Sequence, residues 1–128
     1  MKEHLMNIVH SDQTGFIRGR YIGENITRIL NIMEHAESQK IEAVIMSIDY
    51  EKAYDCVEWN YMNKVLEHFN FGPEFRKWIS ICYTNTTSCV LNNGYTTQFF
   101  KLSREVRQGC PLSPYLFVLC AELVCSDT

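Results

Sequence analysis

The feature that most constrains the fold is a largely apolar run at residues 41–49, which reads IEAVIMSID and is rich in isoleucine and valine. Continuous runs of this kind are typical of strands that are covered on both faces. The run ends at Asp49, so we expect a carboxylate at the C-terminal end of a buried strand. Sheets that carry helices on their faces commonly place their sites at such strand ends. The sequence therefore predicts a sheet backed by helices, with a polar site after this strand.

Helical periodicity surrounds this run. Apolar residues recur at helical spacing in four segments, namely residues 25–38, 55–69, 73–83 and 114–124. Asp55 and Glu58 have the spacing of a capping box, so we expect Asp55 to cap the second of these helices. Gly72 and Pro73 separate the second helix from the third. Ser113 is the expected N-cap of the last helix, which is apolar on nearly all sides and is therefore expected to be buried.

Between the last two helices the pattern changes to that of a β-hairpin. Residues 87–102 read TSCVLNNGYTTQFFKL, and Asn93-Gly94 stands between two runs of β-prone residues. An Asn-Gly pair in this setting is a strong signal for a two-residue hairpin turn. Helices, a predicted buried strand and a hairpin together indicate an α+β fold.

Composition narrows the class of protein. The chain has 128 residues, of which 46% are hydrophobic, and no linker or repeat, so we expect one core. It shows no signal peptide and no apolar run long enough to span a membrane, which predicts an intracellular protein, in the cytoplasm or the nucleus. Six cysteines without a Cys-x-x-Cys pair favour reduced, mostly buried thiols, and the four histidines show no zinc-ligand spacing. The net charge of −3 argues against gripping nucleic acid over the whole surface.

Two stretches have residues suited to chemistry. Asp49 would be ionised at neutral pH and is suited to bind a hard cation such as Mg²⁺; the alternative is that it caps the next turn. The loop at residues 104–114 combines two arginines with Gln108 and Gly109 ahead of a helix, a composition that suits a phosphate or a base pair. Most loops of this composition have no such role.

The order of the motifs resembles that of a known family. Residues 47–59 (SIDYEKAYDCVEW) resemble the first catalytic motif of reverse transcriptases, and residues 104–124 (REVRQGCPLSPYLFVLCAELV) resemble the second. Residues 10–26 (HSDQTGFIRGRYIGENI) are similar to the segment that precedes these motifs in LINE-type (non-LTR) retrotransposons. The resemblance extends from about Leu5 to Val124.

The resemblance implies a role for particular residues. Asp49 matches the catalytic aspartate that binds the metal ions, Mg²⁺ or in its place Mn²⁺, with the backbone carbonyl of Tyr50 as a further ligand. Tyr54 matches the aromatic steric gate beneath the sugar of the incoming nucleotide. Gln108 and Gly109 match the pair that lies along that nucleotide and its template base.

Three arginines are candidates for contact with nucleic acid, namely Arg18, Arg20 and Arg107, although solvated loop arginines are the alternative. The implied reaction is two-metal transfer of dNTPs to a DNA primer on an RNA template. The family's third motif, an aromatic-x-Asp-Asp hairpin, does not follow, because the only aspartate after Asp55 is Asp127 in CSDT.

We therefore expect residues 1–128 to be a partial right-hand polymerase fold, truncated at both ends and comprising part of the fingers and the first half of the palm. We expect no polymerisation by this chain alone. The alternative is a decayed or domesticated remnant that binds RNA or a partner protein without catalysis. A phosphohydrolase with an aspartate nucleophile is a third interpretation, but Glu51 leads into no matching threonine-rich turn. The oligomeric state stays open.

Overall fold

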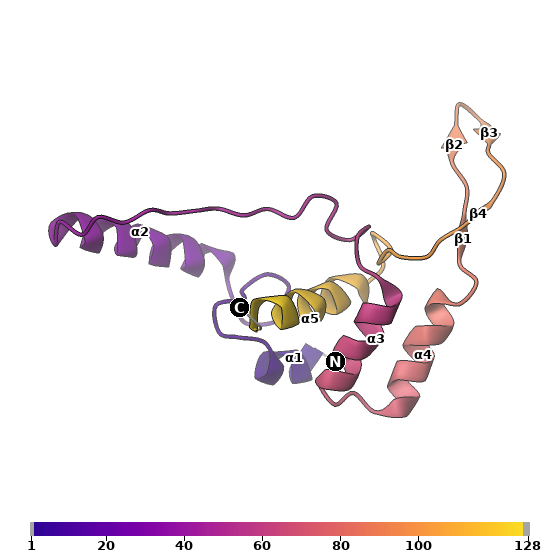
Figure 1. Ribbon diagram of the computed structural model, residues 1–128, viewed down its shortest axis with the longest axis horizontal. Helices are drawn as coiled ribbons and strands as arrows, with labels where there is room; N and C mark the ends of the chain where they lie inside the picture. Colours follow the sequence, from indigo (N-terminus) through magenta and orange to yellow (C-terminus); the bar gives the residue numbers. More distant parts are fainter. Residues whose placement is uncertain (1, 127–128) are drawn as a thin grey trace. The chain divides into compact units, whose positions relative to one another are not determined.

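The computed structural model describes residues 2–126, and the chain divides after Glu51 into two compact units (Figure 1). Asp127 lies outside the described residues. Among the described residues, none of the helices combines the length and apolar character needed to cross a membrane. The structure contains helices and small antiparallel sheets, so the predicted α+β class is confirmed.

The first unit contains two helices joined by a loop. These are α1 (Lys2–Ile8) and α2 (Ile22–Ser38). The predicted helix over residues 25–38 is confirmed and begins three residues earlier than expected. No side chain of α2 is buried, although the helix is amphipathic. The buried apolar residues of this unit lie in α1 and the loop, at Leu5, Val9 and Ile17.

Arg20 ties the loop of the first unit to the end of α1. Its Nη1 donates to the carbonyl oxygens of His10 at 2.5 Å and Gln13 at 2.7 Å, and its Nη2 donates to those of Val9 at 3.2 Å and Met6 at 3.3 Å. The last carbonyls of a helix have no partner within the helix. One guanidinium, with its donors in a rigid fork, reaches the Met6 carbonyl of α1 and three carbonyls of the following loop at once.

A second polar contact holds the start of α2 against the same loop. Asn25 Nδ2 donates to the carbonyl oxygen of Asp12 at 2.7 Å and to Thr14 Oγ1 at 3.2 Å. Arg28 forms an ion pair with the Asp12 carboxylate, which holds the pKa of Asp12 below its usual value. The first unit is therefore organised by backbone carbonyls and polar side chains more than by a large apolar core.

The predicted buried strand at residues 41–49 is wrong. None of these residues belongs to a strand, and the segment runs as an extended trace after α2 (Figure 1). Its apolar side chains are exposed, including Val44 at 94%, Met46 at 79% and Ile48 at 75%. A strand needs a neighbour for its backbone hydrogen bonds. All strands among the described residues pair within the hairpin, so none borders this segment.

The second unit is built around α3 (Trp59–His68), which packs against both α4 (Pro73–Tyr83) and α5 (Ser113–Ser126) (Figure 1). Tyr61 on α3 donates its hydroxyl to the carbonyl oxygen of Cys120 on α5 at 3.0 Å. The fully buried apolar side chains of this core are Met62, Val65, Leu66, Val106, Leu116, Val118 and Leu119. Burying this set supplies most of the unit's hydrophobic stabilisation.

Two predicted helix starts need correction. Asp55 does not cap α3, because the N-cap is Glu58 and no side chain makes a capping hydrogen bond there. Ser113 is the first residue of α5, and its hydroxyl is buried without a hydrogen-bond partner. The predicted start of α4 is confirmed, with Gly72 as N-cap and Pro73 in the first turn.

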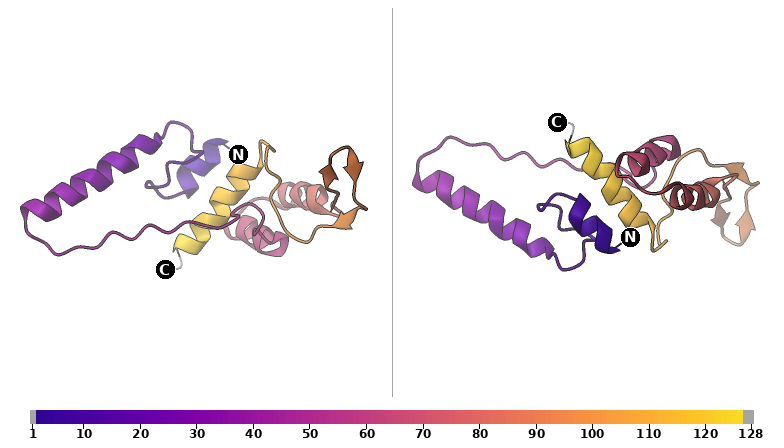
Figure 2. Two further views of the ribbon diagram at one scale, coloured as in Figure 1. Left: turned by 90° about the horizontal axis from the view of Figure 1, so that it is seen from above. Right: turned by 90° about the horizontal axis from the view of Figure 1, so that it is seen from below.

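The predicted hairpin is confirmed. It consists of β1 (Thr87–Ser88), β2 (Leu91–Asn92), β3 (Tyr95–Thr96) and β4 (Phe100–Lys101), with β1 paired to β4 and β2 paired to β3. Asn93 and Gly94 have φ values of 49° and 82°, as a two-residue turn with left-handed backbone requires. In Figures 1 and 2 the hairpin projects beyond α4, away from α3 and α5.

No disulfide joins any of the six cysteines within residues 2–126. The expectation that most of them are buried is wrong, because only Cys120 is buried, whereas Cys56, Cys82 and Cys125 are exposed. Cys89 and Cys110 lie between these extremes.

We predict that Arg20→Ala lowers the free energy of unfolding of the first unit by about 2 kcal/mol, because several carbonyls lose a charged donor. Arg20→Lys should recover only part of this loss, since an ammonium group lacks the planar fork. Urea unfolding followed by circular dichroism measures the effect. Arg18→Ala is the matched control, because Arg18 is exposed in the same loop. Equal unfolding midpoints for Arg20→Ala and Arg18→Ala would contradict the proposed role of Arg20.

Candidate functional site

The candidate site lies where residues 54–58 meet residues 104–106 in the second unit. The backbone N–H of Val106 donates to the carbonyl oxygen of Tyr54 at 2.8 Å, and that of Glu105 donates to Val57 at 2.9 Å. An antiparallel bridge pairs Glu58 with Arg104. Val57 and Val106 are buried, so water does not compete strongly for these hydrogen bonds. The two predicted motifs are therefore joined by their backbones.

Tyr54 lies on this junction. Its ring stacks on that of Phe117 in α5, with ring centroids 5.0 Å apart and planes inclined by 28°. The side chain is half-buried. Because its backbone carbonyl is bonded to Val106 and its ring rests on a core helix, Tyr54 is held at both ends. A ring fixed in this way can act as a wall of a site.

Gln108 and Gly109 follow in the loop before α5. Gln108 Nε2 lies 3.5 Å from Asp55 Oδ1, at the outer limit of a hydrogen bond. Gly109 has a φ of +81°, a conformation that glycine adopts without strain. No atom lies within 4 Å of the place where its side chain would begin, so the backbone of Gly109 borders open space. The structure thus brings Tyr54, Asp55 and Gln108 into one region.

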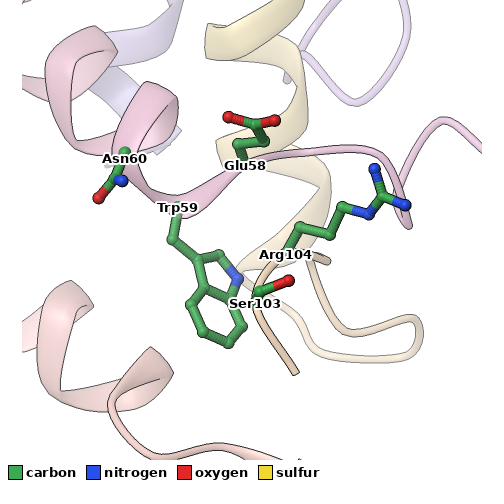
Figure 3. A pocket seen from close by; sticks show the side chains of 5 residues that line it. All are labelled: Glu58, Trp59, Asn60, Ser103 and Arg104. Atoms are coloured by element: carbon green, nitrogen blue, oxygen red, sulfur yellow. The ribbon is translucent and has the colours of Figure 1, made fainter. Parts of the chain in front are cut away.

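Trp59 stabilises this junction through a hydrogen bond from its indole. Its indole Nε1 donates to the carbonyl oxygen of Glu105 at 2.8 Å, and its ring lies 5.5 Å from that of Tyr83. Figure 3 shows the indole beside Ser103, in an open pocket of about 530 Å³ that Glu58, Asn60 and Arg104 also line. Sequence reasoning missed this tryptophan. The only signal was that a half-buried tryptophan usually finds a hydrogen-bond acceptor.

Cys110 lies close to the start of α5, with Tyr83 nearby. The backbone N–H of Leu112 lowers the pKa of the Cys110 thiol, assisted by the N–H of Ser113 and the charge of Arg107. Burial raises the pKa of Tyr83 to about 12, and the neighbouring Cys110 contributes to that rise. The end of the loop therefore favours the thiolate form of Cys110 and the neutral form of Tyr83.

Asp49 and Tyr50 belong to the first unit, whereas Tyr54, Gln108, Gly109 and Arg107 belong to the second. The side chain of Asp49 is exposed. Within residues 2–126, no three histidine, cysteine, aspartate or glutamate side chains are grouped so that they could hold a metal ion. Mg²⁺ takes six oxygen ligands, often one or two carboxylates with water and phosphate oxygens. The donors of Asp49 and Tyr50 fit part of such a set.

The three candidate arginines differ in their surroundings. The guanidinium of Arg20 is bonded to backbone carbonyls of its own loop, a structural role that the sequence did not indicate. Arg18 and Arg107 are exposed. Their contact with nucleic acid stays a prediction.

We predict that Cys110 is alkylated by iodoacetamide with a lower pH midpoint than an unperturbed cysteine, because the fold stabilises its thiolate and lowers its pKa. The thiolate fraction of Cys110 should exceed that of free cysteine below the midpoint, and the difference should disappear at high pH, where both thiols are ionised. Peptide mapping by mass spectrometry at a series of pH values measures the midpoint.

Two comparisons test this prediction. Arg107→Ala should move the Cys110 midpoint upward, because one nearby positive charge is lost. Cys120 serves as the internal control, since burial raises its pKa to about 12 and it should react only on unfolding. A Cys110 midpoint at or above the ordinary value in the folded chain would refute the prediction.

Comparison with known proteins agrees with these motifs. Residues 1–127 match the family model described as "Reverse transcriptase (RNA-dependent DNA polymerase)". The chain is 33% identical over 122 residues, 95% of its length, to the transposon TX1 uncharacterized 149 kDa protein of Xenopus laevis, of which it covers 9%.

Two further relatives are Pol polyproteins. The chain is 31% identical over 111 residues to the retrovirus-related Pol polyprotein from the type-1 retrotransposable element R2 of Nasonia vitripennis, covering 86% of this chain and 11% of that protein. It is 25% identical over 107 residues to the corresponding polyprotein from the type-2 retrotransposable element R2DM of Drosophila melanogaster, covering 84% of this chain and 10% of that protein. The chain thus spans about a tenth of these relatives. It belongs to the reverse transcriptase (RNA-dependent DNA polymerase) family, in the branch of the non-LTR retrotransposons.

Proposed function

We propose that this chain is the part of an RNA-directed DNA polymerase that supplies one metal-binding carboxylate and one side of the nucleotide site. The observation that carries the proposal is the backbone pairing of residues 54–58 with 104–106, because it joins the two motifs named by the family resemblance. The parent protein would add dNTPs to a DNA primer on an RNA template. In that protein the chain would form part of the fingers and the first half of the palm.

Asp49 is the proposed catalytic residue. Its exposed carboxylate and the backbone carbonyl of Tyr50 would hold Mg²⁺, or Mn²⁺ in its place, together with oxygens from water and substrate phosphates. A bound pair of such ions would supply the charge stabilisation and nucleophile activation of two-metal phosphoryl transfer. A second carboxylate is needed to hold two dications, and we propose that it comes from another part of the parent protein. The chain alone is then inactive.

Tyr54 is the proposed steric gate. Its ring is fixed against Phe117, so a sugar placed over it would meet a rigid surface. A 2′-hydroxyl is the group that distinguishes a ribonucleotide from a deoxyribonucleotide. A rigid wall excludes this extra group more effectively than a mobile side chain. Discrimination would therefore come from the ring of Tyr54 and not from its hydroxyl.

Gln108 and Gly109 would border the incoming nucleotide and its template base. The amide of Gln108 both donates and accepts hydrogen bonds, and its position beside Asp55 restricts its orientation. The open space at Gly109 would admit the nucleotide close to the backbone.

Arg18 and Arg107 are the proposed phosphate contacts, because both are exposed. Arg20 is a weaker candidate for contact with phosphate, since its guanidinium already donates to backbone carbonyls. We place the parent protein inside the cell, in the cytoplasm, the nucleus or both.

We predict that Asp49→Asn in the parent protein lowers dNTP incorporation on an RNA template on the order of a thousandfold, because a metal ligand worth several kcal/mol is lost. Primer extension with Mg²⁺ measures the rate. Asp55→Asn is the matched control and should change the rate far less, since Asp55 is not a proposed metal ligand and an asparagine oxygen can still accept from Gln108.

The isolated 128-residue chain gives a second comparison. It should incorporate no more dNTP than its own Asp49→Asn variant. Incorporation well above that variant, or equal losses from Asp49→Asn and Asp55→Asn in the parent protein, would overturn the assignment of Asp49. A parent protein that binds RNA without extending any primer would favour the non-catalytic alternative.

We predict that Tyr54→Ala in the parent protein admits ribonucleotides, because the wall beneath the sugar is removed. Tyr54→Phe should keep the discrimination, since the ring and its stacking on Phe117 remain. The measurement is the ratio of kcat/KM for a dNTP and the matching rNTP. Unchanged sugar discrimination in Tyr54→Ala would remove the gate assignment.

A further inference from the structure

The hairpin of the second unit exposes aromatic rings that nothing in the site uses. Residues 90–101 are all exposed. Tyr95 is 81% exposed, Phe99 is 73% exposed and Phe100 is 46% exposed. Clusters of exposed large apolar side chains on a folded protein commonly mark a binding surface. We call Tyr95, Phe99, Phe100 and Lys101 the hairpin surface.

The two ladders of the hairpin are out of register by one residue. Between its two ladders the outgoing strand has two residues, Cys89 and Val90, whereas the returning strand has three, at positions 97–99. One extra residue in a strand bends it and redirects its side chains, as in a β-bulge. Phe99 lies in this extra stretch, next to Phe100 at the end of the second ladder. Phe99 therefore lies in an irregular stretch of the hairpin, whereas Tyr95 and Phe100 lie in its paired strands.

The charge of the segment indicates what these rings bind. No acidic residue occurs between Glu74 and Glu105, and Lys101 and Arg104 lie at the base of the hairpin. Both cations are exposed. The whole chain has a net charge of −3, so the absence of acids here is a local departure from its composition. Glu58, which is bridged to Arg104, and Glu105, which follows Arg104 in sequence, belong to the junction of residues 54–58 with 104–106 and not to the hairpin.

Exposed rings combined with cations and without acids match the chemistry of single-stranded nucleic acid. Bases stack on aromatic side chains, and every base offers a face for stacking, while cations follow the phosphates. Bases within a duplex are already stacked on each other and cannot use the rings. A surface that binds another protein would not need to exclude acids.

We propose that the hairpin surface binds single-stranded RNA, with bases stacked on Tyr95 and Phe99 and a phosphate at Lys101. The choice of RNA rests on the proposed function, in which the protein handles an RNA template. The hairpin follows α4 in the second unit, and none of its residues is among those proposed for nucleotide addition (Figure 1).

Fluorescence anisotropy of a labelled 15-residue oligouridylate, titrated with the 128-residue chain, tests the proposal. Each of Tyr95→Ala and Phe99→Ala should weaken binding on the order of tenfold, because one stacking surface is lost. Tyr95→Phe should keep the affinity, since stacking needs the ring and not the hydroxyl. Lys101→Ala should reduce the slope of log K against log salt by about one, whereas the aromatic variants leave that slope unchanged.

Trp78→Ala is the matched control, because Trp78 is an aromatic residue of α4 that is 66% exposed. It should leave the affinity unchanged. The substituted hairpin residues are exposed, so the fold should persist, and circular dichroism checks this.

Several results would overturn the proposal. The first is an unchanged affinity for the oligouridylate in Tyr95→Ala and Phe99→Ala, and the second is a loss of affinity in Trp78→Ala as large as in these variants. The third is tighter binding to single-stranded DNA or duplex RNA of matching sequence than to the single-stranded RNA. A change of oligomeric state in the hairpin variants without a change in RNA affinity would instead identify a protein interface. The assay contains no primer or dNTP, so its failure is independent of the polymerase proposal. Primer extension by the parent protein could succeed while this binding fails, or the reverse.

Discussion

The arrangement of the second unit depends on two backbone hydrogen bonds, from Val106 to Tyr54 and from Glu105 to Val57. They connect segments about fifty residues apart in sequence, and the helix α3 and hairpin lie between them. The core around α3 buries the side chains of Val57 and Val106, so packing and pairing stabilise each other. The position of every proposed nucleotide-binding residue follows from this pairing. The pairing also explains why α3 begins at Trp59 and not at residue 55 as predicted, because the bridge holds Glu58 in an extended conformation.

The two units provide hydrogen-bond partners for unpaired backbone groups in different ways. Backbone polar groups that leave a helix or strand need a partner. In the second unit the partner is another stretch of backbone, assisted by the indole of Trp59. In the first unit it is the side chain of Arg20, which serves the end of α1 and the following loop. A single charged side chain thus has the role in the first unit that the backbone pairing of residues 54–58 with 104–106 has in the second.

Features set by neighbouring residues could be predicted from the sequence. The turn at Asn93 and the start of α4 at Pro73 are examples, because glycine and proline fix local backbone angles. Features set by distant residues could not. The run at residues 41–49 has strand composition, but composition does not supply a neighbouring strand. The bond from Trp59 to Glu105 likewise depends on a pairing that no local pattern reveals. The roles of the site residues came from the family resemblance and stay predictions.

Between its two ladders the hairpin has two residues in the outgoing strand and three in the returning strand, and this mismatch affects how its length can vary. Side chains alternate between the two faces of a strand, so removing one residue from positions 97–99 would bring the two ladders into a common register. The loss would then turn part of the returning strand over and exchange its two faces. A pair of compensating changes, one in each strand, would preserve the present faces. The lengths of the two strands are therefore coupled wherever the present faces of the hairpin are to be kept.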